Sequence, residues 1–173
     1  MFATIYLPDF YLQAALRHQP ELAGKPVALI DDQEKKAVIV QLSAAAADVG
    51  VRRGMTPSQG LARSLELRIK VRNAAQEKIL QEILLHFAAT LAPYVEATGP
   101  GLATVQFTDP RNIGRKMANV VACLAASEIT GQAGIAPTPD ASFLAAHLAE
   151  PVLEITEARE FLSALPIEVL AIS

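Results

Sequence analysis

The chain has 173 residues, of which 51% are apolar and 19% charged, and its formal net charge is −3. This composition excludes an intrinsically disordered chain, and the length suffices for one good core or two small lobes. It also argues against a self-sufficient nucleic-acid binder, because phosphate contacts need an excess of Lys and Arg.

The N-terminal part predicts a strand followed by a small mixed segment. Residues 2–7 are rich in aromatic and branched side chains, and Pro8-Asp9 ends that strand. Asp9 is a candidate N-cap for a helix over 10–17, and a hairpin is expected over 27–42. Ser43 and Thr56 are expected to cap two short helices, and a strand follows at 67–71.

From residue 74 onward, helices and strands alternate. The expected elements are a helix at 74–92, a strand pair at 95–98 and 102–107, a helix opened by Asp109 that ends near Gly131, a strand at 133–136, a helix capped by Asp140, and a strand at 152–155. Together with the first strand, this order is the βαββαβ logic of a ferredoxin-like split unit. We therefore predict an α/β (α+β) fold in which a subdomain over 10–73 is inserted after the first strand.

The cysteine content and the apolar segments indicate the compartment. The single cysteine, Cys123, lies in an apolar helical stretch, where we expect it to be a small buried hydrophobe. A chain without an internal disulfide is typical of a reducing cytoplasm. The N-terminus lacks the basic region of a signal peptide, and the longest apolar helical stretch, 79–94, is too short and too polar to cross a bilayer. We expect a cytoplasmic protein that does not contact membranes.

Five phrases in a fixed order carry a resemblance to a known family. They are DFY at 9–11, PELAGKPVAL at 20–29, GVRRGM at 50–55, AGIAPTPDASFLAAHLAEP at 133–151 and FLSALPIEVL at 161–170. In these phrases the chain resembles the Y-family, or translesion, DNA polymerases of the UmuC and DinB kind, over nearly its whole length. The resemblance implies a ferredoxin-like palm at 1–9 and 74–164, a fingers subdomain at 10–73, and the start of a truncated thumb at 165–173.

The resemblance also implies where a polymerase of this family would hold its two metal ions. Active members supply one carboxylate from the first strand and an adjacent Asp-Glu pair from a later hairpin. The matching positions here are Tyr6, Gly101 and Leu102, and Pro8 stands where another Asp is common. Two-metal phosphoryl transfer needs hard oxygen ligands. We therefore expect no catalytic residue, no bound metal and no other cofactor.

The nucleotide-binding positions of the family are also replaced. The resemblance places its fingers Tyr and Arg at Ala44 and Ala47, and its palm Lys at Phe143. None of these side chains offers the positive charge that a polyphosphate needs. Phe10 and Tyr11 match the aromatic pair beside the incoming sugar, although packing in the core or between lobes is the better interpretation when no nucleotide binds.

Two arginines are candidates for DNA contact. Arg52 and Arg53 lie in a loop between two glycines, which would let the chain approach a template phosphate. The alternative is a solvated surface. We expect DNA binding by the chain alone to be weak, because its net charge is negative.

The pattern of losses resembles the ImuB-type branch of the family. Such proteins are inactive relatives that act as adaptors in damage-induced (SOS) mutagenesis. They bring an error-prone polymerase to DNA through the sliding clamp and a RecA-like protein, by segments that lie beyond this chain. Two alternatives stay open: an active translesion nucleotidyltransferase with relocated carboxylates, at Asp9, Asp109 and Asp140, and an unrelated ferredoxin-like interaction module.

Overall fold

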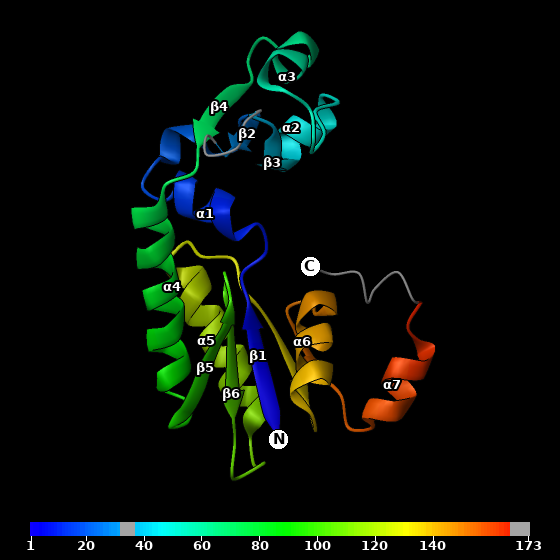
Figure 1. Ribbon diagram of the computed structural model, residues 1–173. Helices are drawn as coiled ribbons and strands as arrows, with labels where there is room; N and C mark the ends of the chain where they lie inside the picture. The colour runs from blue at the N-terminus through cyan, green and yellow to red at the C-terminus, as the bar shows by residue number, and fades with distance from the viewer. Residues whose placement is uncertain (32–36, 167–173) are drawn as a thin grey trace. The chain divides into compact units, whose positions relative to one another are not determined.

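The computed structural model describes residues 1–31 and 37–166 (Figure 1). The chain divides into two compact units. Unit 1 comprises Met1–Pro8 and the chain from Gln81 onward, and unit 2 comprises Asp9–Leu80. The second division falls inside helix α4 (Ala74–Ala89), later than the predicted boundary at 73/74. The assignment of these units to palm and fingers stays a prediction. Most of the predicted thumb start, residues 167–173, lies outside the described residues.

Unit 1 contains a five-stranded sheet in the order β5-β6-β1-β7-β8. Its strands are β1 (Phe2–Tyr6), β5 (Tyr94–Gly99), β6 (Leu102–Gln106), β7 (Gln132–Ala136) and β8 (Val152–Glu154). The central strand β1 is antiparallel to both β6 and β7, and β8 is parallel to β7. The first four strands have the order of a ferredoxin-like unit. The predicted fold class is confirmed, and β8 extends the sheet at one edge.

The helices of unit 1 cover this sheet because its residues alternate between two faces. Besides α4, they are α5 (Ile113–Ala126) and α6 (Pro139–Leu148), whereas α7 (Ala158–Ala164) lies next to α6 and buries no residue. On β1, Ala3 and Ile5 are fully buried on one face, and Thr4 is fully buried on the other, where its hydroxyl meets Ser142 of α6. Figure 1 shows α6 running alongside β1 and β7.

Unit 2 is built on a three-stranded sheet in the order β3-β2-β4. Its elements are α1 (Phe10–Leu16), a 3-10 helix (Pro20–Leu22), β2 (Val27–Ile30), β3 (Ile39–Leu42), α2 (Ala44–Asp48), α3 (Pro57–Arg63) and β4 (Arg68–Val71). β2 lies between β3, which is antiparallel to it, and β4, which is parallel. Its alternating side chains separate two small cores, with Val27 and Leu29 in one and Ala28 in the other.

Two predicted helix caps are present as hydrogen bonds. The Ser43 hydroxyl accepts from the backbone N–H of Ala46 at the start of α2. Thr56 and Gln59 form a reciprocal capping box at the start of α3, where Pro57 holds the first helical position. These local signals sufficed because the capping hydrogen bonds themselves join residues only three positions apart, although the Ser43 hydroxyl also bonds to the backbone of Lys25 and Val27.

Of the three other predicted caps, Asp9 has the predicted position without a capping hydrogen bond, and Asp109 and Asp140 are wrong. Asp9 stands at the N-cap position of α1 with a positive φ of 47°, and its side chain caps nothing. Asp109 accepts hydrogen bonds from the backbone and guanidinium of Arg111, so α5 begins only after Asn112 and ends at Ala126. Asp140 lies within the first turn of α6, whose cap is Thr138.

One further expectation concerns Cys123 in α5. Cys123 is exposed, because α5 turns its neighbours Val121 and Leu124 toward the core and this position away from it. The expectation of a buried thiol is therefore wrong.

In the part of the chain that the structure describes, no helix has the length and apolar character needed to span a bilayer.

Candidate metal and nucleotide site

The three residues predicted to replace metal-binding carboxylates meet at one end of the unit 1 sheet. Tyr6 and Leu102 are direct partners across β1 and β6, and the N–H of Leu7 donates to the carbonyl of Gly101 at 2.8 Å. Gly101 forms the β5–β6 turn with a positive φ of 71°. Gln81 of α4 fixes this turn, since its side chain accepts from the Gly101 N–H at 2.8 Å and donates to the Leu102 carbonyl at 3.2 Å.

Aromatic rings fill the space beside this strand end. The ring of Tyr6 stacks on His147 with centroids 4.0 Å apart and an interplanar angle of 25°. Phe143, one turn earlier on α6, has its centroid 4.4 Å from that of His147. The Nδ1 atom of His147 lies 2.9 Å from the Phe143 carbonyl oxygen, which orients the imidazole. We call Tyr6, His147 and Phe143 the aromatic stack.

The residues at this strand end do not fit a pair of divalent metals. Mg²⁺ is held in proteins mainly by carboxylate and other hard oxygen atoms. Here a phenol, a glycine and a leucine stand at the three positions, with an imidazole against the phenol. Within residues 1–31 and 37–166, no three His, Cys, Asp or Glu side chains gather where they could share a metal ion. We therefore derive no reaction step through a metal at this place.

The relocated carboxylates of the alternative prediction are engaged elsewhere or lie apart from this strand end. Asp9 pairs with Arg53 and Asp109 with Arg111, each at 2.7 Å. The hydrogen bond from Arg111 lowers the pKa of Asp109. Asp140 is exposed in the first turn of α6. No observation therefore favours these three as a shared ligand set.

Because His147 is half-buried, its protonation should oppose folding. Burial lowers its pKa, and the hydrogen bond to the Phe143 carbonyl only partly offsets this. A lowered folded-state pKa means that the stabilising effect is complete above the unfolded pKa of about 6.5 and is lost as the pH falls through the folded-state value. We expect the urea midpoint to fall more between pH 7.5 and 5 in the parent than in a His147→Gln variant.

The control for this pH effect is the exposed imidazole of His86. A His86→Gln variant removes an imidazole that is not part of the aromatic stack. If His147→Gln and His86→Gln respond identically to pH, then burial of the stacked imidazole does not contribute to acid sensitivity.

A chain of hydroxyl groups crosses the same sheet face as the stack. The Oγ1 atoms of Thr98 and Thr104 lie 3.2 Å apart, and those of Thr104 and Thr4 lie 3.1 Å apart. Thr4 then meets the Ser142 hydroxyl at 2.8 Å, which donates to the Pro139 carbonyl at 2.7 Å. The buried hydroxyl groups of Thr4, Thr104 and Ser142 therefore all have hydrogen-bond partners, as burial requires.

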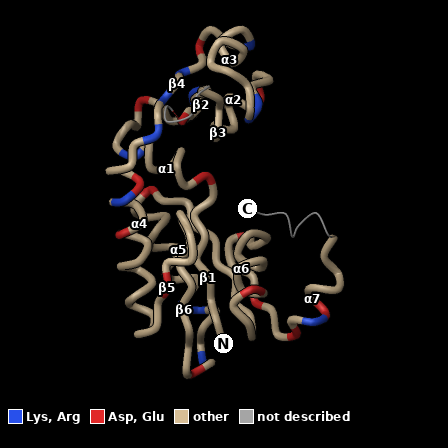
Figure 2. Tube along the Cα trace, viewed as in Figure 1, with Lys and Arg blue, Asp and Glu red and all other residues tan. Residues whose placement is uncertain are grey.

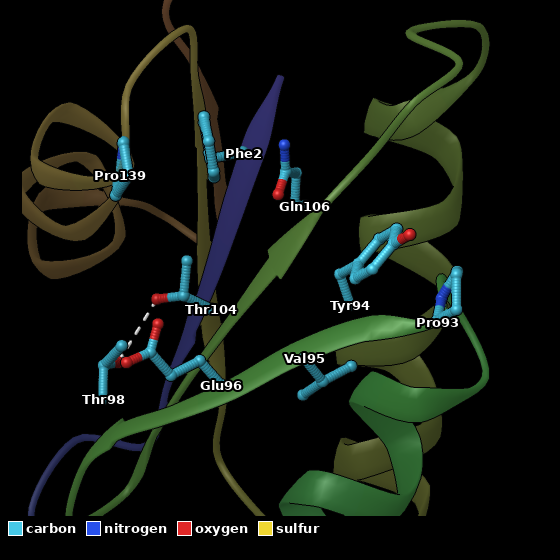
Figure 3. Close-up of a pocket in the computed structure, with 9 residues that line it drawn as sticks. All are labelled: Phe2, Pro93, Tyr94, Val95, Glu96, Thr98, Thr104, Gln106 and Pro139. Atoms are coloured by element: carbon cyan, nitrogen blue, oxygen red, sulfur yellow. Dashed lines mark hydrogen bonds between the residues drawn. The ribbon is translucent and has the colours of Figure 1, made fainter.

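A pocket of about 290 Å³ opens over one end of this hydroxyl chain (Figure 3). It is lined by Phe2, Pro93, Tyr94, Val95, Glu96, Thr98, Thr104, Gln106 and Pro139. Figure 3 shows Glu96 beside the hydrogen-bonded pair Thr98 and Thr104. Glu96 is the one charged side chain in this lining, so the pocket disfavours phosphate and offers hydrogen bonds to a neutral polar group.

The nucleotide positions predicted in unit 2 lie on α2. Ala44 is exposed at its first residue, and Ala47 is partly buried one turn later. Neither methyl group can bind a phosphate. Their correspondence to the family's Tyr and Arg stays a prediction, as does that of Phe143 to its Lys.

Both candidate DNA-contacting arginines have partners within unit 2. The Nη1 atom of Arg52 donates to the carbonyls of Ala47 at 2.6 Å and Val51 at 2.7 Å, which places its charge at the C-terminal end of α2. Arg53 pairs with Asp9, and this pair is exposed. Exposed ion pairs contribute little, so Arg53 can exchange its carboxylate for another anion at small cost. A role in DNA contact stays a prediction.

Phe10 and Tyr11, the predicted sugar-gate-like pair, are both fixed by packing. Phe10 is buried, and its ring meets that of Tyr11 edge-on with centroids 5.4 Å apart. The guanidinium of Arg72 lies 3.8 Å above the Tyr11 ring centroid. Arg72 also forms two hydrogen bonds with Glu77 and one with Asp31. The hydrogen bonds that Arg72 donates to the Glu77 carboxylate raise the pKa of Arg72.

The comparison with protein families decides the identity of this scaffold. Residues 5–147 match the model of the impB/mucB/samB family, whose members are Y-family DNA polymerases. The chain belongs to this family. The resemblance predicted from the five phrases is therefore confirmed, and an unrelated ferredoxin-like module is excluded.

Solved structures of Y-family polymerases share the fold. The post-insertion binary complex of Dbh DNA polymerase superposes with a TM-score of 0.86 at 17% identity, covering 97% of this chain and 52% of that one. Its insertion ternary complex gives 0.84 at 16%, with 97% and 53% covered. DinB from Sulfolobus solfataricus gives 0.75 at 17%, with 97% and 52% covered. The chain thus spans about half the length of these polymerases. No curated protein sequence matches it significantly.

Proposed function

We propose that this Y-family chain is a non-catalytic, polymerase-like adaptor of the ImuB type in DNA repair and translesion synthesis. The observation that carries the proposal is the aromatic stack of Tyr6, His147 and Phe143, at the strand end where the resemblance puts a metal-binding carboxylate. A site lined by aromatic rings in place of carboxylates suits a scaffold that positions DNA and partners while another polypeptide performs synthesis.

The charge distribution supports weak DNA contact through one unit. Unit 2 carries 11 Lys and Arg against 8 Asp and Glu, a net +3, whereas the rest of the chain has 4 against 10, a net −6. Figure 2 shows Lys and Arg around α2, α3 and β4. We propose that unit 2, including Arg52 and Arg53, touches the DNA backbone. The sliding clamp, an error-prone polymerase and a RecA-like protein would bind segments beyond this chain, in the cytoplasm.

Metal binding tests the proposal directly. We compare Mn²⁺ binding, followed by water-proton relaxation, between the parent chain and a Tyr6→Asp/Gly101→Asp/Leu102→Glu variant. The variant should bind Mn²⁺ at least about tenfold more tightly, because it gains three clustered carboxylates. A Tyr6→Asn/Gly101→Asn/Leu102→Gln variant, which has similar shape without the charges, should behave as the parent does.

Two results would overturn the proposal. One is Mn²⁺ binding by the parent chain that selectively broadens the NMR signals of His147, because a metal would then lie at the strand end. The other is the absence of any gain in the acidic variant, because Tyr6, Gly101 and Leu102 would then not correspond to the family's ligand positions.

A further inference from the structure

β4, one of the two outer strands of the unit 2 sheet, presents a backbone edge that pairs with no other strand among the described residues. It lies at the end of the sheet order β3-β2-β4. The N–H groups of Arg68 and Arg72 donate to carbonyls at the two ends of β2, at 2.9 and 3.0 Å. Because successive residues of a strand point their backbone groups alternately to either side, those of Ile69 and Val71 point away from β2. Among the described residues, neither forms a backbone hydrogen bond beyond the β2–β4 ladder.

The side chains around this edge combine positive charge with exposed apolar surface. Arg68 is exposed and Lys70 partly exposed, on the opposite strand face from Ile69 and Val71. Val71 is 45% exposed, and Leu65, just before the strand, is 94% exposed. Figure 2 shows Lys and Arg along β4. A surface of this kind complements an extended segment in which acidic and apolar residues alternate.

We propose that β4 is a docking edge for an extended, acidic-apolar peptide segment of another protein, which adds to the sheet as a fourth strand. Backbone hydrogen bonds to Ile69 and Val71 would supply affinity, and Arg68 and Lys70 would select acidic side chains. β4 belongs to unit 2 and uses none of the residues at the strand end of Tyr6, so the proposal does not depend on whether the chain is catalytic.

Charge and hydrogen-bonding chemistry argue against a second copy of this chain and against DNA as the molecule that binds this edge. A second copy of this chain would bring another Arg68 and Lys70 against the same edge, and like charges on facing strands repel each other. DNA would satisfy the basic side chains, but phosphates do not complement the alternating N–H and C=O groups or the exposed Leu65 and Val71.

The test uses a blocked octapeptide of alternating glutamate and valine as the probe, with a lysine-valine octapeptide for comparison. Amide NMR shifts and hydrogen exchange of the purified chain report binding and its location. We expect the acidic peptide to shift and protect the amides of Ile69 and Val71, and to bind at least about threefold more tightly than the basic peptide.

One variant pair isolates the backbone edge. Val71→Pro removes an outward N–H without removing a hydrogen bond to β2, which is where an edge strand tolerates proline. It should weaken acidic-peptide binding about threefold to tenfold, whereas Val71→Thr, which keeps the N–H, should retain it. A thermal unfolding curve of each variant establishes that the sheet is folded.

A second variant tests the charge selection without proline. Arg68→Glu/Lys70→Glu should reverse the preference, so that the lysine-valine peptide binds more tightly. The proposal is overturned if Val71→Pro binds the peptide as the parent does or if the preference does not reverse. It also fails if duplex DNA displaces the peptide from these amides. A third contradicting result is a dimeric parent chain in sedimentation together with a monomeric Val71→Pro variant.

Discussion

A Gly134→Ala substitution is expected to destabilise unit 1 by about 3 kcal/mol or more, at the upper end of the cost of overpacking a core. Gly134 lies in β7 directly beneath α6. A Cβ atom there would collide with the backbone N of Ala146 and the carbonyl O of Ser142, and would lie 2.6 Å from the carbonyl C of Ala145. Since these are helix backbone atoms, no side-chain rotation relieves the clash, and α6 would have to move off the sheet.

Urea unfolding followed by circular dichroism measures this effect. The matched control is Gly114→Ala in α5, where the added methyl meets only the flexible end of Glu154, at 3.0 Å. This control should be neutral or stabilising by up to about 1 kcal/mol, because alanine favours the helix. Equal stability of the Gly134→Ala variant and the parent would contradict the close approach of α6 to β7.

Removal of Arg72 is expected to have the second large effect, this time in unit 2. Its guanidinium binds Glu77 through two hydrogen bonds of 2.9 and 2.8 Å and Asp31 through one of 2.8 Å. The side chains of Asp31 and Glu77 are only 18% and 13% exposed, so an Arg72→Met variant leaves two largely buried carboxylates without this cation. We expect a loss of about 2–4 kcal/mol, somewhat below that for a fully buried pair because Arg72 is 30% exposed.

Two comparisons make the Arg72 prediction specific, again by urea unfolding. Arg72→Lys should recover only part of the loss, because an ammonium cannot reproduce the paired hydrogen bonds or lie flat on the Tyr11 ring. Arg68→Met removes an exposed arginine at the start of β4, the strand that ends just before Arg72, and should change stability by less than about 0.5 kcal/mol. Similar losses for Arg72→Met and Arg68→Met would mean that the buried cluster contributes nothing particular.

The success of the sequence prediction depended on how far apart the interacting residues are. The strand order of unit 1 followed from the alternation of elements, and the Ser43 and Thr56 caps followed from neighbouring residues. Asp9 carries an equally good capping signal, yet its carboxylate pairs with Arg53, 44 residues away. A local pattern cannot reveal such a competitor, because only the folded chain brings the two together.

The same reasoning explains what was missed at the candidate site. The sequence named Tyr6 and Phe143 as separate replacements, and the structure shows that His147 lies against both rings. The spacing of Phe143 and His147 on a predicted helix was the available signal, because residues four apart share a helix face. The contact with Tyr6 could not be predicted, because it depends on how α6 lies across β1. The contacts of Arg72 with Asp31 and Tyr11 could not be predicted for a similar reason, because both partners are distant in sequence.

The hydroxyl chain of Thr98, Thr104, Thr4 and Ser142 also favours the native register of β1 against β6. If β1 slipped by one residue against β6, Thr4 would face Ala103 or Val105, and its side chain would turn to the other face. The hydroxyls left behind would be sealed from water with nothing to bond to, at about 1–3 kcal/mol each. The buried hydroxyl groups thus raise the free energy of misaligned strand registers more than they lower that of the native register.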